Sequence, residues 1–280
     1  MVDEVQRDET TERAPAEGAP PEHGETREAA GDVWIDASPE RVWRALTDAR
    51  ELERWFPLEA EVEPGEGGRL RMSWGGEYDA EMPILVWDPP THLRTSWFGQ
   101  GVVTDYVIRA EKGGTRIRAV SSGFPLDPSW DEWVEGTVRG WAYELRALKH
   151  YLERHDGRDR RALFVRRRVH MPRERVWERL TGTDGLDPRW TEGERVDHQP
   201  PVQVATILEE PAGAMARASV EPVLHDDASA ADENRGRAHD ATLWISLWGA
   251  SGDAARAIER EWVETLERAF PDGETMVERR

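Results

Sequence analysis

Alternating apolar and polar positions dominate the middle of the first half of the chain and predict an antiparallel sheet. Five segments show the period of two expected of strands with one buried face, and they are 69–74, 77–86, 92–98, 102–110 and 115–122. Pairs or clusters of Gly and Pro separate them, as turns between neighbouring strands require. The residues from Val33 to Ile35 alternate in the same way, so an earlier strand precedes this meander.

Helical periodicity flanks the predicted sheet on both sides. Ser38 and Pro39 predict the N-terminus of a short helix, and a second short helix is expected over 50–56. Pro128 then begins a long helix, whose apolar stripe comprises Trp141, Leu145, Leu148 and Leu152. Because this stripe is continuous, the helix is expected to lie on the sheet.

The same pattern then starts again in the second half. A strand is expected over 162–169, and 174–181 (ERVWERLT) repeats 40–47 (ERVWRALT) with six of eight residues identical. Trp262 and Leu266 repeat the spacing of Trp141 and Leu145. Two matches in the same order predict an internal duplication.

The duplication predicts an α+β chain of two tandem domains, the second abridged. The expected boundaries are a disordered acidic tail over 1–27, a first domain over 28–157, a second over 158–272 and a C-terminal tail over 273–280. Within the second domain, 202–208, 214–223 and 241–248 read as strands, whereas 225–240 is polar and of low complexity and predicts a disordered loop. The segment 182–201 offers Gly, Pro and charge, so this domain is expected to enclose little or no cavity.

An ordered set of short segments carries a family likeness. The set is VWIDASPERVWRALTDARELERWF (33–56), DPP (88–90), GGTRI (113–117), SGF (122–124) and GW (140–141). It resembles the SRPBCC, or START-like, superfamily, and within it the bacterial proteins similar to the C-terminal domain of the activator of the heat-shock protein 90 ATPase. The resemblance spans nearly all of the first half but only the first and last helices of the second. It implies the helix-grip (START/Bet v-like) fold, a curved antiparallel sheet around a long C-terminal helix with a cavity between them, and no single activity.

Charge and composition exclude several kinds of partner. The net charge of the 280 residues is −19 and the pI is about 4.9, so nucleic acid and anionic membranes are repelled at long range. The absence of cysteine excludes disulfides and thiolate metal sites. No apolar run approaches the roughly 18 to 20 residues that span a bilayer. We therefore expect a cytoplasmic protein that binds neither nucleic acid nor membrane.

Tryptophan is unusually frequent, with fourteen indoles against five phenylalanines. Alternation places an apolar and aromatic surface with a few hydroxyls on one face of the sheet, the composition of a lipophilic pocket. The predicted ligand-binding residues are Met72, Trp74, Thr95, Trp97, Thr104, Tyr106 and Ser121 on the sheet, and Trp133, Gly136, Gly140 and Trp141 on the helix. The alternative is that these side chains only fill the core. Likewise, the two glycines either make room for a ligand or let the helix approach the sheet closely.

The sequence shows no catalytic signature, and we predict no catalytic residue, no cofactor and no metal site. The predicted inner face offers hydroxyls but no carboxylate or imidazole, because Asp105 and Arg118 alternate outward. His150 and His155 are five residues apart on the predicted helix, a poor spacing for sharing a metal. Tyr106 with its hydroxyl neighbours could still polarise a carbonyl, so a cyclase or aromatase-like enzyme stays open.

The leading hypothesis is noncatalytic binding, sequestration or transport of a hydrophobic small molecule in the cavity of the first domain. Such a ligand would be a lipid or an aromatic or polyketide-like compound, held by shape and indole stacking. One alternative is the cyclase-like enzyme, and another is a chaperone cofactor, which only the resemblance implies. A protein partner or a homodimer is left open, as is an abridged second domain that caps the first.

Overall fold

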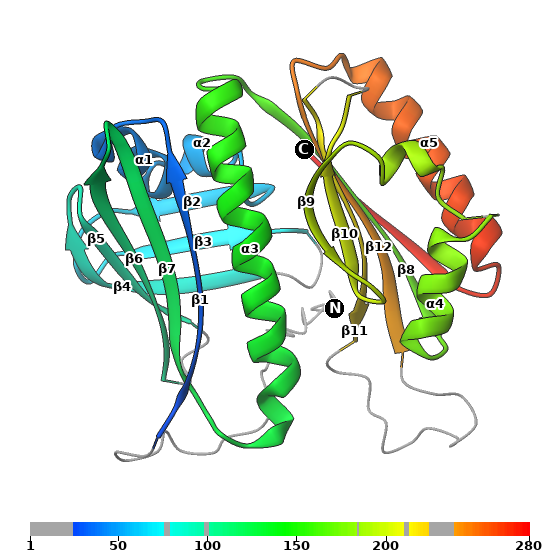
Figure 1. Cartoon of the computed structure of the whole chain (residues 1–280), viewed down its shortest axis with the longest axis horizontal. Coiled ribbons are helices and arrows are strands. Elements are labelled where there is room, and N and C mark those ends of the chain that lie inside the picture. The colour runs from blue at the N-terminus through cyan, green and yellow to red at the C-terminus, as the bar shows by residue number, and fades with distance from the viewer. Residues whose placement is uncertain (1–24, 76–78, 98–100, 184, 210–212, 224–237) are drawn as a thin grey trace, which may run out of the picture.

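Two antiparallel sheets, each packed against a long helix, make up the chain (Figure 1). The computed structural model describes residues 25–75, 79–97, 101–183, 185–209, 213–223 and 238–280. The α+β class and the helix-grip arrangement in two tandem copies are therefore confirmed. Among the described helices, none combines the length and the apolar composition needed to cross a bilayer.

The first sheet has the strand order β1-β7-β6-β5-β4-β3-β2. Its strands are β1 (Arg27–Ile35), β2 (Glu59–Glu63), β3 (Arg69–Ser73), β4 (Asp79–Asp88), β5 (His92–Trp97), β6 (Val102–Glu111) and β7 (Gly114–Phe124). Helices α1 (Pro39–Thr47) and α2 (Ala49–Leu52) connect β1 to β2. The 3-10 turn η1 (Pro128–Trp130) leads into the long helix α3 (Asp131–Arg154).

The second sheet has the order β13-β8-β12-β11-β10-β9. Its strands are β8 (Arg160–His170), β9 (Glu194–Gln199), β10 (Gln203–Ile207), β11 (Met215–Pro222), β12 (Ala238–Trp248) and β13 (Glu274–Arg279). Helix α4 (Arg173–Thr181) and the turn η2 (Pro188–Trp190) precede β9, and α5 (Gly252–Ala269) follows β12. By position, β8, β12, β11, β10 and β9 correspond to β1, β7, β6, β5 and β4, so the described part of the second domain has no counterparts of β3 and β2.

The predicted C-terminal tail over 273–280 is wrong, because β13 lies there and pairs with the edge of β8. Met276 faces Arg166 across this pair, and the Arg167 guanidinium donates to the Thr275 hydroxyl and, over 3.0 Å, to the carbonyl of Pro271. These contacts satisfy backbone and side-chain groups that a free tail would leave in water. The C-terminal strand thereby closes the edge that β8 would otherwise expose.

Four other strands differ from the prediction. Strand β1 begins at Arg27, inside the expected tail, whose residues 1–24 lie outside the described part of the chain. Strand β2 was missed because glutamates occupy its exposed positions and only Ala60 and Val62 are partly buried. Strand β9 lies within the segment expected to contribute only Gly, Pro and charge. Strand β12 begins at Ala238, so the rest of the predicted loop over 225–240 falls outside the described residues.

The predicted alternation of the first sheet is confirmed. On β6, every second residue from Val102 to Ile108 is buried. Asp105 points outward, where His92 Nε2 and Arg94 Nε lie 2.6 and 2.8 Å from the same carboxylate oxygen. The face that carries the predicted site residues is therefore the buried one.

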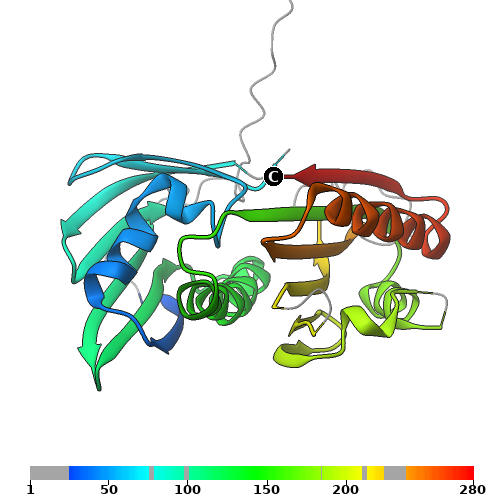
Figure 2. The same cartoon turned by 90° about the horizontal axis from the view of Figure 1, so that it is seen from above.

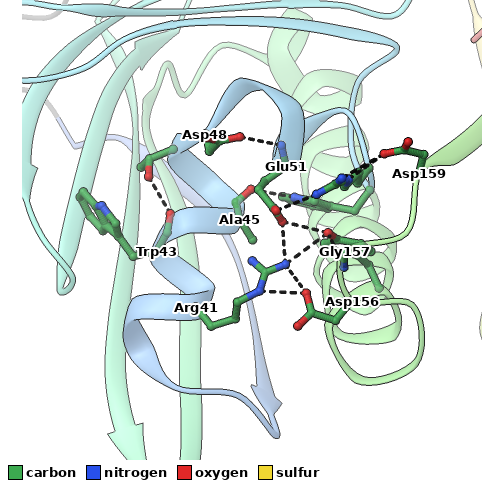
Figure 3. A network of polar contacts seen from close by, with 12 residues as sticks. Arg41, Trp43, Ala45, Asp48, Glu51, Asp156, Gly157 and Asp159 are labelled. Carbon is green, nitrogen blue, oxygen red and sulfur yellow. Dashed lines mark hydrogen bonds and ion pairs between the residues drawn. The ribbon is translucent and has the colours of Figure 1, made fainter.

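The corner between α1 and α2 is fastened to the end of α3 by a network of polar contacts (Figure 3). Glu51 is buried, and its carboxylate accepts from Arg41 at 2.6 Å, from Tyr151 at 2.8 Å and from Arg54 at 2.8 Å. Arg54 also donates to Asp159 at 3.0 Å, just beyond α3. This network fixes the segment in which the chain leaves the first domain for the second.

The second sheet is covered on both faces (Figure 2). Helix α5 packs on one face, and α3 of the first domain lies against the other. Phe164 and Trp244 therefore belong to the same apolar cluster as the core of the first domain. Three donors of the second domain also reach main-chain carbonyls of the first: Arg160 to Phe56 at 3.2 Å, Trp248 to Arg54 at 2.9 Å and Arg280 to Leu58 at 2.7 Å. The two domains thus share one continuous interior.

Candidate functional site

Three hydroxyl residues lie side by side on the inner face of the first sheet. Thr95 on β5 is paired with Thr104 on β6, which is paired with Ser121 on β7. All three are fully buried. The hydroxyls of Thr104 and Ser121 are 2.9 Å apart, and the Trp141 indole N–H on α3 donates to the Ser121 hydroxyl over 3.1 Å. A row of hydroxyls therefore crosses three strands of an otherwise apolar face, and hydrogen bonds join the helix to the hydroxyls of two of these strands.

This chain leaves hydroxyl hydrogens without acceptors. A hydroxyl carries one hydrogen and can accept at two lone pairs, so a single bond between Thr104 and Ser121 uses only one of their two hydrogens. The Thr95 hydroxyl is buried and has no hydrogen-bond partner among the described residues. An unsatisfied buried polar group costs about 1 to 3 kcal/mol. The cluster could therefore bond to a carbonyl or hydroxyl of a bound molecule at little cost.

The two glycines of α3 do not let the helix approach the sheet. Among the described residues, a Cβ atom built on Gly140 meets nothing within 4 Å, and one built on Gly136 meets only the end of the Arg139 side chain at 3.8 Å. The close approach occurs at Gly31 on β1, where a Cβ atom would lie 3.0 Å from the Cβ of Trp141. Of the two sequence interpretations of Gly136 and Gly140, the geometry favours the one in which they leave room beside the helix.

The predicted aromatic residues divide into two groups. Tyr106 and Trp141 are buried and pack edge to face at 5.6 Å, directly beside the hydroxyl cluster. Trp97 is partly buried and packs against both the main core and a small apolar cluster formed by Ala29, Val102 and Phe124. The hydroxyls and Gly140 thus lie near the place where the two apolar clusters of the first domain separate.

The remaining predicted residues lie farther from this cluster. Met72 is buried in the main core, and the Trp74 ring packs edge to face on Phe56 at 5.2 Å, near the second domain. Trp133 is partly exposed on the first turn of α3, with its ring 6.3 Å from that of Trp130. The structure therefore brings together Thr95, Thr104, Tyr106, Ser121 and Trp141, with Trp97 at the border and Gly136 and Gly140 on the preceding turn of α3, and leaves Met72, Trp74 and Trp133 at the margins.

A carboxyl group that the sequence interpretation missed lies on the same side of α3. Glu144 follows Gly140 by four residues and therefore shares its helix face. Burial raises the pKa of Glu144 to about 7, although the charges of Arg217 and Arg160 in the second domain act in the opposite direction. Burial, with the charge of Glu144 adding to it, also raises the pKa of Tyr106, which stays a neutral phenol. The spacing of Gly136, Gly140 and Glu144 indicates a shared helix face, but it does not indicate that the carboxyl group is buried.

The histidine pair is closer than its spacing indicated. Since α3 ends at Arg154, His155 leaves the helix, and its Nε2 atom comes within 3.2 Å of the Nε2 atom of His150. Both nitrogens also lie near the Gly213 carbonyl oxygen, at 2.7 Å from His150 and 3.2 Å from His155. Within the described residues, no group of three or more His, Cys, Asp or Glu side chains is placed to hold a metal ion. The pair forms a contact between the domains, where the ring of His155 stacks on Trp248 at 4.5 Å.

Comparison with protein families matches residues 36–153 to the family described as Activator of Hsp90 ATPase homolog 1-like protein. The match runs from the turn before α1 to the last turn of α3, and so contains the whole hydroxyl cluster. No curated protein matches the chain.

Several solved structures resemble the chain. The protein MLL2253 from Mesorhizobium loti is 27% identical, with 46% of this chain and 99% of that chain covered and a TM-score of 0.42. The Aha1 dimer from Colwellia psychrerythraea is 19% identical, with 47% and 99% covered and a TM-score of 0.42. DynU16, a protein in the dynemicin biosynthetic locus, is 18% identical over 87% of this chain and 96% of its own, with a TM-score of 0.41.

Proposed function

Residues 36–153 form a domain of the Activator of Hsp90 ATPase homolog 1-like family, and from this premise we propose that the chain binds a hydrophobic small molecule without changing it chemically. The ligand would be a lipid or an aromatic or polyketide-like compound. It would lie in the first domain between α3 and the inner face of the sheet. Sequestration or transport of that compound would be the biological outcome.

One observation carries this proposal: open space beside Gly140 lies close to a buried hydroxyl cluster with unused hydrogens. Glycine in the middle of a helix costs about 1 kcal/mol relative to alanine, so the empty space is maintained against helix stability. Ligand pockets are mostly apolar with a few placed polar groups. Tyr106 and Trp141 supply the apolar surface, and Thr95 supplies a hydroxyl that can orient an oxygen of the ligand.

In this proposal the second domain forms one wall of the ligand-binding site. Its sheet contributes Phe164, Ala205, Met215 and Trp244 to the core of the first domain. The Arg217 guanidinium also lies 4.8 Å from the centre of the Tyr143 ring on α3. This sheet would shield a ligand on α3 from water, which raises the free-energy gain from burying apolar surface.

Native mass spectrometry of the freshly purified full-length chain, combined with titration of N-phenyl-1-naphthylamine, tests the proposal. This probe is neutral and apolar, and it accepts excitation energy from indoles. We expect a copurified apolar molecule or, after its removal, one probe bound per chain with energy transfer from tryptophan. A chain that shows only its own mass and transfers no energy to the probe would contradict the proposal.

A second candidate function, a cyclase-like enzyme, is favoured by one specific feature. A carboxyl group with a pKa near 7 is suited to proton transfer at neutral pH, and Glu144 has this property near the neutral phenol of Tyr106. Replacement of Glu144 with Gln separates the two functions once a ligand is known. A carrier should keep its affinity within about threefold, whereas an enzyme should lose turnover with little change in binding.

A further inference from the structure

A groove of about 680 Å³ lies at the junction of the two domains, away from the hydroxyl cluster. Its lining comes from four separate segments: α2, the connection from α3 into β8, the turn between β12 and α5, and the last residue of the chain. The lining residues are Arg50, Arg158, Asp159, Arg160, Arg161, Gly249, Ala250 and Arg280. We call this set the arginine groove.

The arginine groove has a charge opposite to that of the molecule. Five arginines and one aspartate line it, a formal excess of four positive charges, whereas the whole chain has a net charge of −19. Guanidinium groups this close repel one another, and the repulsion is screened only over about 8 to 10 Å at ordinary ionic strength. Neutralising carboxylates or a bound anion would relieve this repulsion.

The nearby carboxylates neutralise only part of this positive charge. One oxygen of Asp159 accepts from Arg54 Nε and Nη2, outside the groove, at 3.1 and 3.0 Å (Figure 3). The other oxygen of Asp159 lies 3.5 Å from Arg50. Glu53 pairs with Arg280. Two carboxylates, one of them shared with an arginine outside, therefore face five guanidinium groups.

Three of the five arginines form no ion pair with a carboxylate of the described residues. Arg160 donates to the carbonyls of Phe56 and Pro57, and Arg161 donates to the carbonyl of Ala250 at 3.2 Å. Arg158 is exposed, and its guanidinium makes no hydrogen bond or ion pair with any described residue. The groove therefore presents positive charge from Arg158 and Arg161 with no ion-pair partner among the described residues, and from Arg160, which makes no direct ion pair with them.

The deepest of these arginines is held in unfavourable surroundings. Arg160 is 4% exposed, and its Nε atom has no hydrogen-bond partner among the described residues. Burial, with the charge of Arg280 adding to it, lowers the pKa of Arg160 to about 10, although Glu144, Tyr143 and Glu53 act in the opposite direction. A negative charge in the groove would relieve this cost.

We propose that the arginine groove binds a soluble small molecule that carries several phosphate groups. The guanidinium fork matches the geometry of phosphate oxygens and forms charge-assisted, bidentate hydrogen bonds with them. The volume is within the range of small-molecule sites. Since both domains line the groove, its occupant would bridge Arg50 of the first domain and Arg161 of the second.

This site is independent of the apolar site proposed above. The groove is polar and open to solvent, whereas the space beside Gly140 borders buried apolar side chains. Loss of one binding activity should therefore leave the other unchanged. Bound phosphate would also stabilise the contact between the two domains, to which the hydrogen bonds of Arg160 and Arg280 already contribute.

Isothermal titration calorimetry of the full-length chain with inorganic tripolyphosphate at low ionic strength tests this proposal. The double variant R158Q/R161Q removes two exposed charges from the groove. The matched control R71Q/R118Q removes two exposed charges from the outer face of the first sheet. We expect tripolyphosphate affinity to fall about tenfold or more in the groove variant and to stay within about twofold in the control. The single variant R158Q is measured as well. Because it removes no hydrogen bond or ion pair with a described residue, a loss of affinity in this variant would not come from misfolding.

A lipid could present the same phosphate chemistry, so a second arm uses phosphatidylcholine vesicles with and without phosphatidic acid. Tripolyphosphate binding that the groove variant weakens supports a soluble ligand. Binding only to phosphatidic acid vesicles, lost in the groove variant, would keep the phosphate site but assign it to a lipid and overturn the soluble ligand. The proposal fails if neither probe binds, or if both double variants weaken binding equally.

Discussion

At the scale of single residues, the Thr95 hydroxyl is the strongest indication of a bound molecule. Its neighbours Thr104 and Ser121 bond to each other and to Trp141, whereas Thr95 is buried with no partner among the described residues. A valine of the same shape would fill this position without the desolvation cost. Threonine here is therefore better explained by a bound molecule than by stability.

Replacing Thr95 with Val should separate these two effects. Without ligand, we expect the free energy of unfolding to rise by about 1 kcal/mol, because an unsatisfied buried hydroxyl is removed. Affinity for an apolar ligand that bears an oxygen should fall about fivefold. Urea unfolding and ligand titration measure the two quantities, with T104V as the control that breaks a formed hydrogen bond. A T95V variant less stable than the wild type would argue against an unpaired hydroxyl.

The residues of the hydroxyl cluster could be predicted because strands alternate strictly, so Thr95, Thr104 and Ser121 had to share a face. Glu144 could not be found in this way. Its surroundings include Arg160 and Arg217, which come from another domain, and no local pattern shows that packing. Likewise, the arginine groove gathers Arg50 and Arg280 from opposite ends of the sequence.

At the scale of elements, α3 packs closely on the first sheet at Trp141, whereas the adjacent Gly140 leaves space on another side of the same turn. Gly31 permits the tight contact with Trp141, and Gly140 leaves the loose side open. The pattern of the chain predicted the long helix and the central meander well, because both have strong periodicity. It missed β2, β9 and β13, whose exposed positions carry charged residues. The pairing of β13 also depends on β8, which is distant in sequence.

Alanine substitution at the two glycines should have opposite effects on stability. G140A should raise the free energy of unfolding by about 1 kcal/mol through helix propensity, because the new methyl group enters open space. G31A should lower it by about 1 to 3 kcal/mol, because its Cβ atom would press on that of Trp141. Thermal unfolding followed by circular dichroism measures both. Equal destabilisation by the two variants would show that α3 packs tightly at Gly140 as well.

At the scale of the whole molecule, the second sheet is a layer shared by two domains. Its strand β12 is buried along its full length: α4 and α5 pack on it, and Trp244 and Trp248 belong to the core shared with the first domain. His150, His155 and Trp248 lie in this contact. The docking of the domains should therefore depend on the charge of the two imidazoles.

Acidification should weaken the structure through this histidine pair. Burial lowers the pKa of His155 to about 4, with the neighbouring His150 and the cations Arg158 and Arg154 adding to the effect, while the Gly213 carbonyl opposes it. Burial also lowers the pKa of His150, against opposing effects from the Gly213 carbonyl, Glu194 and Glu153. A histidine that must stay neutral when folded adds stability above its unfolded pKa of about 6.5. That stability is lost as the pH falls from about 6.5 towards 4.

The difference between the wild type and H155F isolates this contribution. Phenylalanine keeps the stack on Trp248 but cannot take up a proton. Urea unfolding at pH 7.5 and at pH 5 should show a smaller loss of stability in H155F than in the wild type, and H198Q, at an exposed histidine of β9, should behave as the wild type does. Equal losses of stability in H155F and the wild type would show that protonation of His155 does not weaken the structure.

The most direct test of the central claim compares G140L with A142L. Both variants add a leucine to the same helix, but Ala142 is exposed, whereas Gly140 borders the proposed ligand space. We predict that G140L stays folded and loses at least about tenfold in affinity for N-phenyl-1-naphthylamine, while A142L binds as the wild type does. Equal binding by the two folded variants would contradict the claim that a ligand occupies the space beside Gly140.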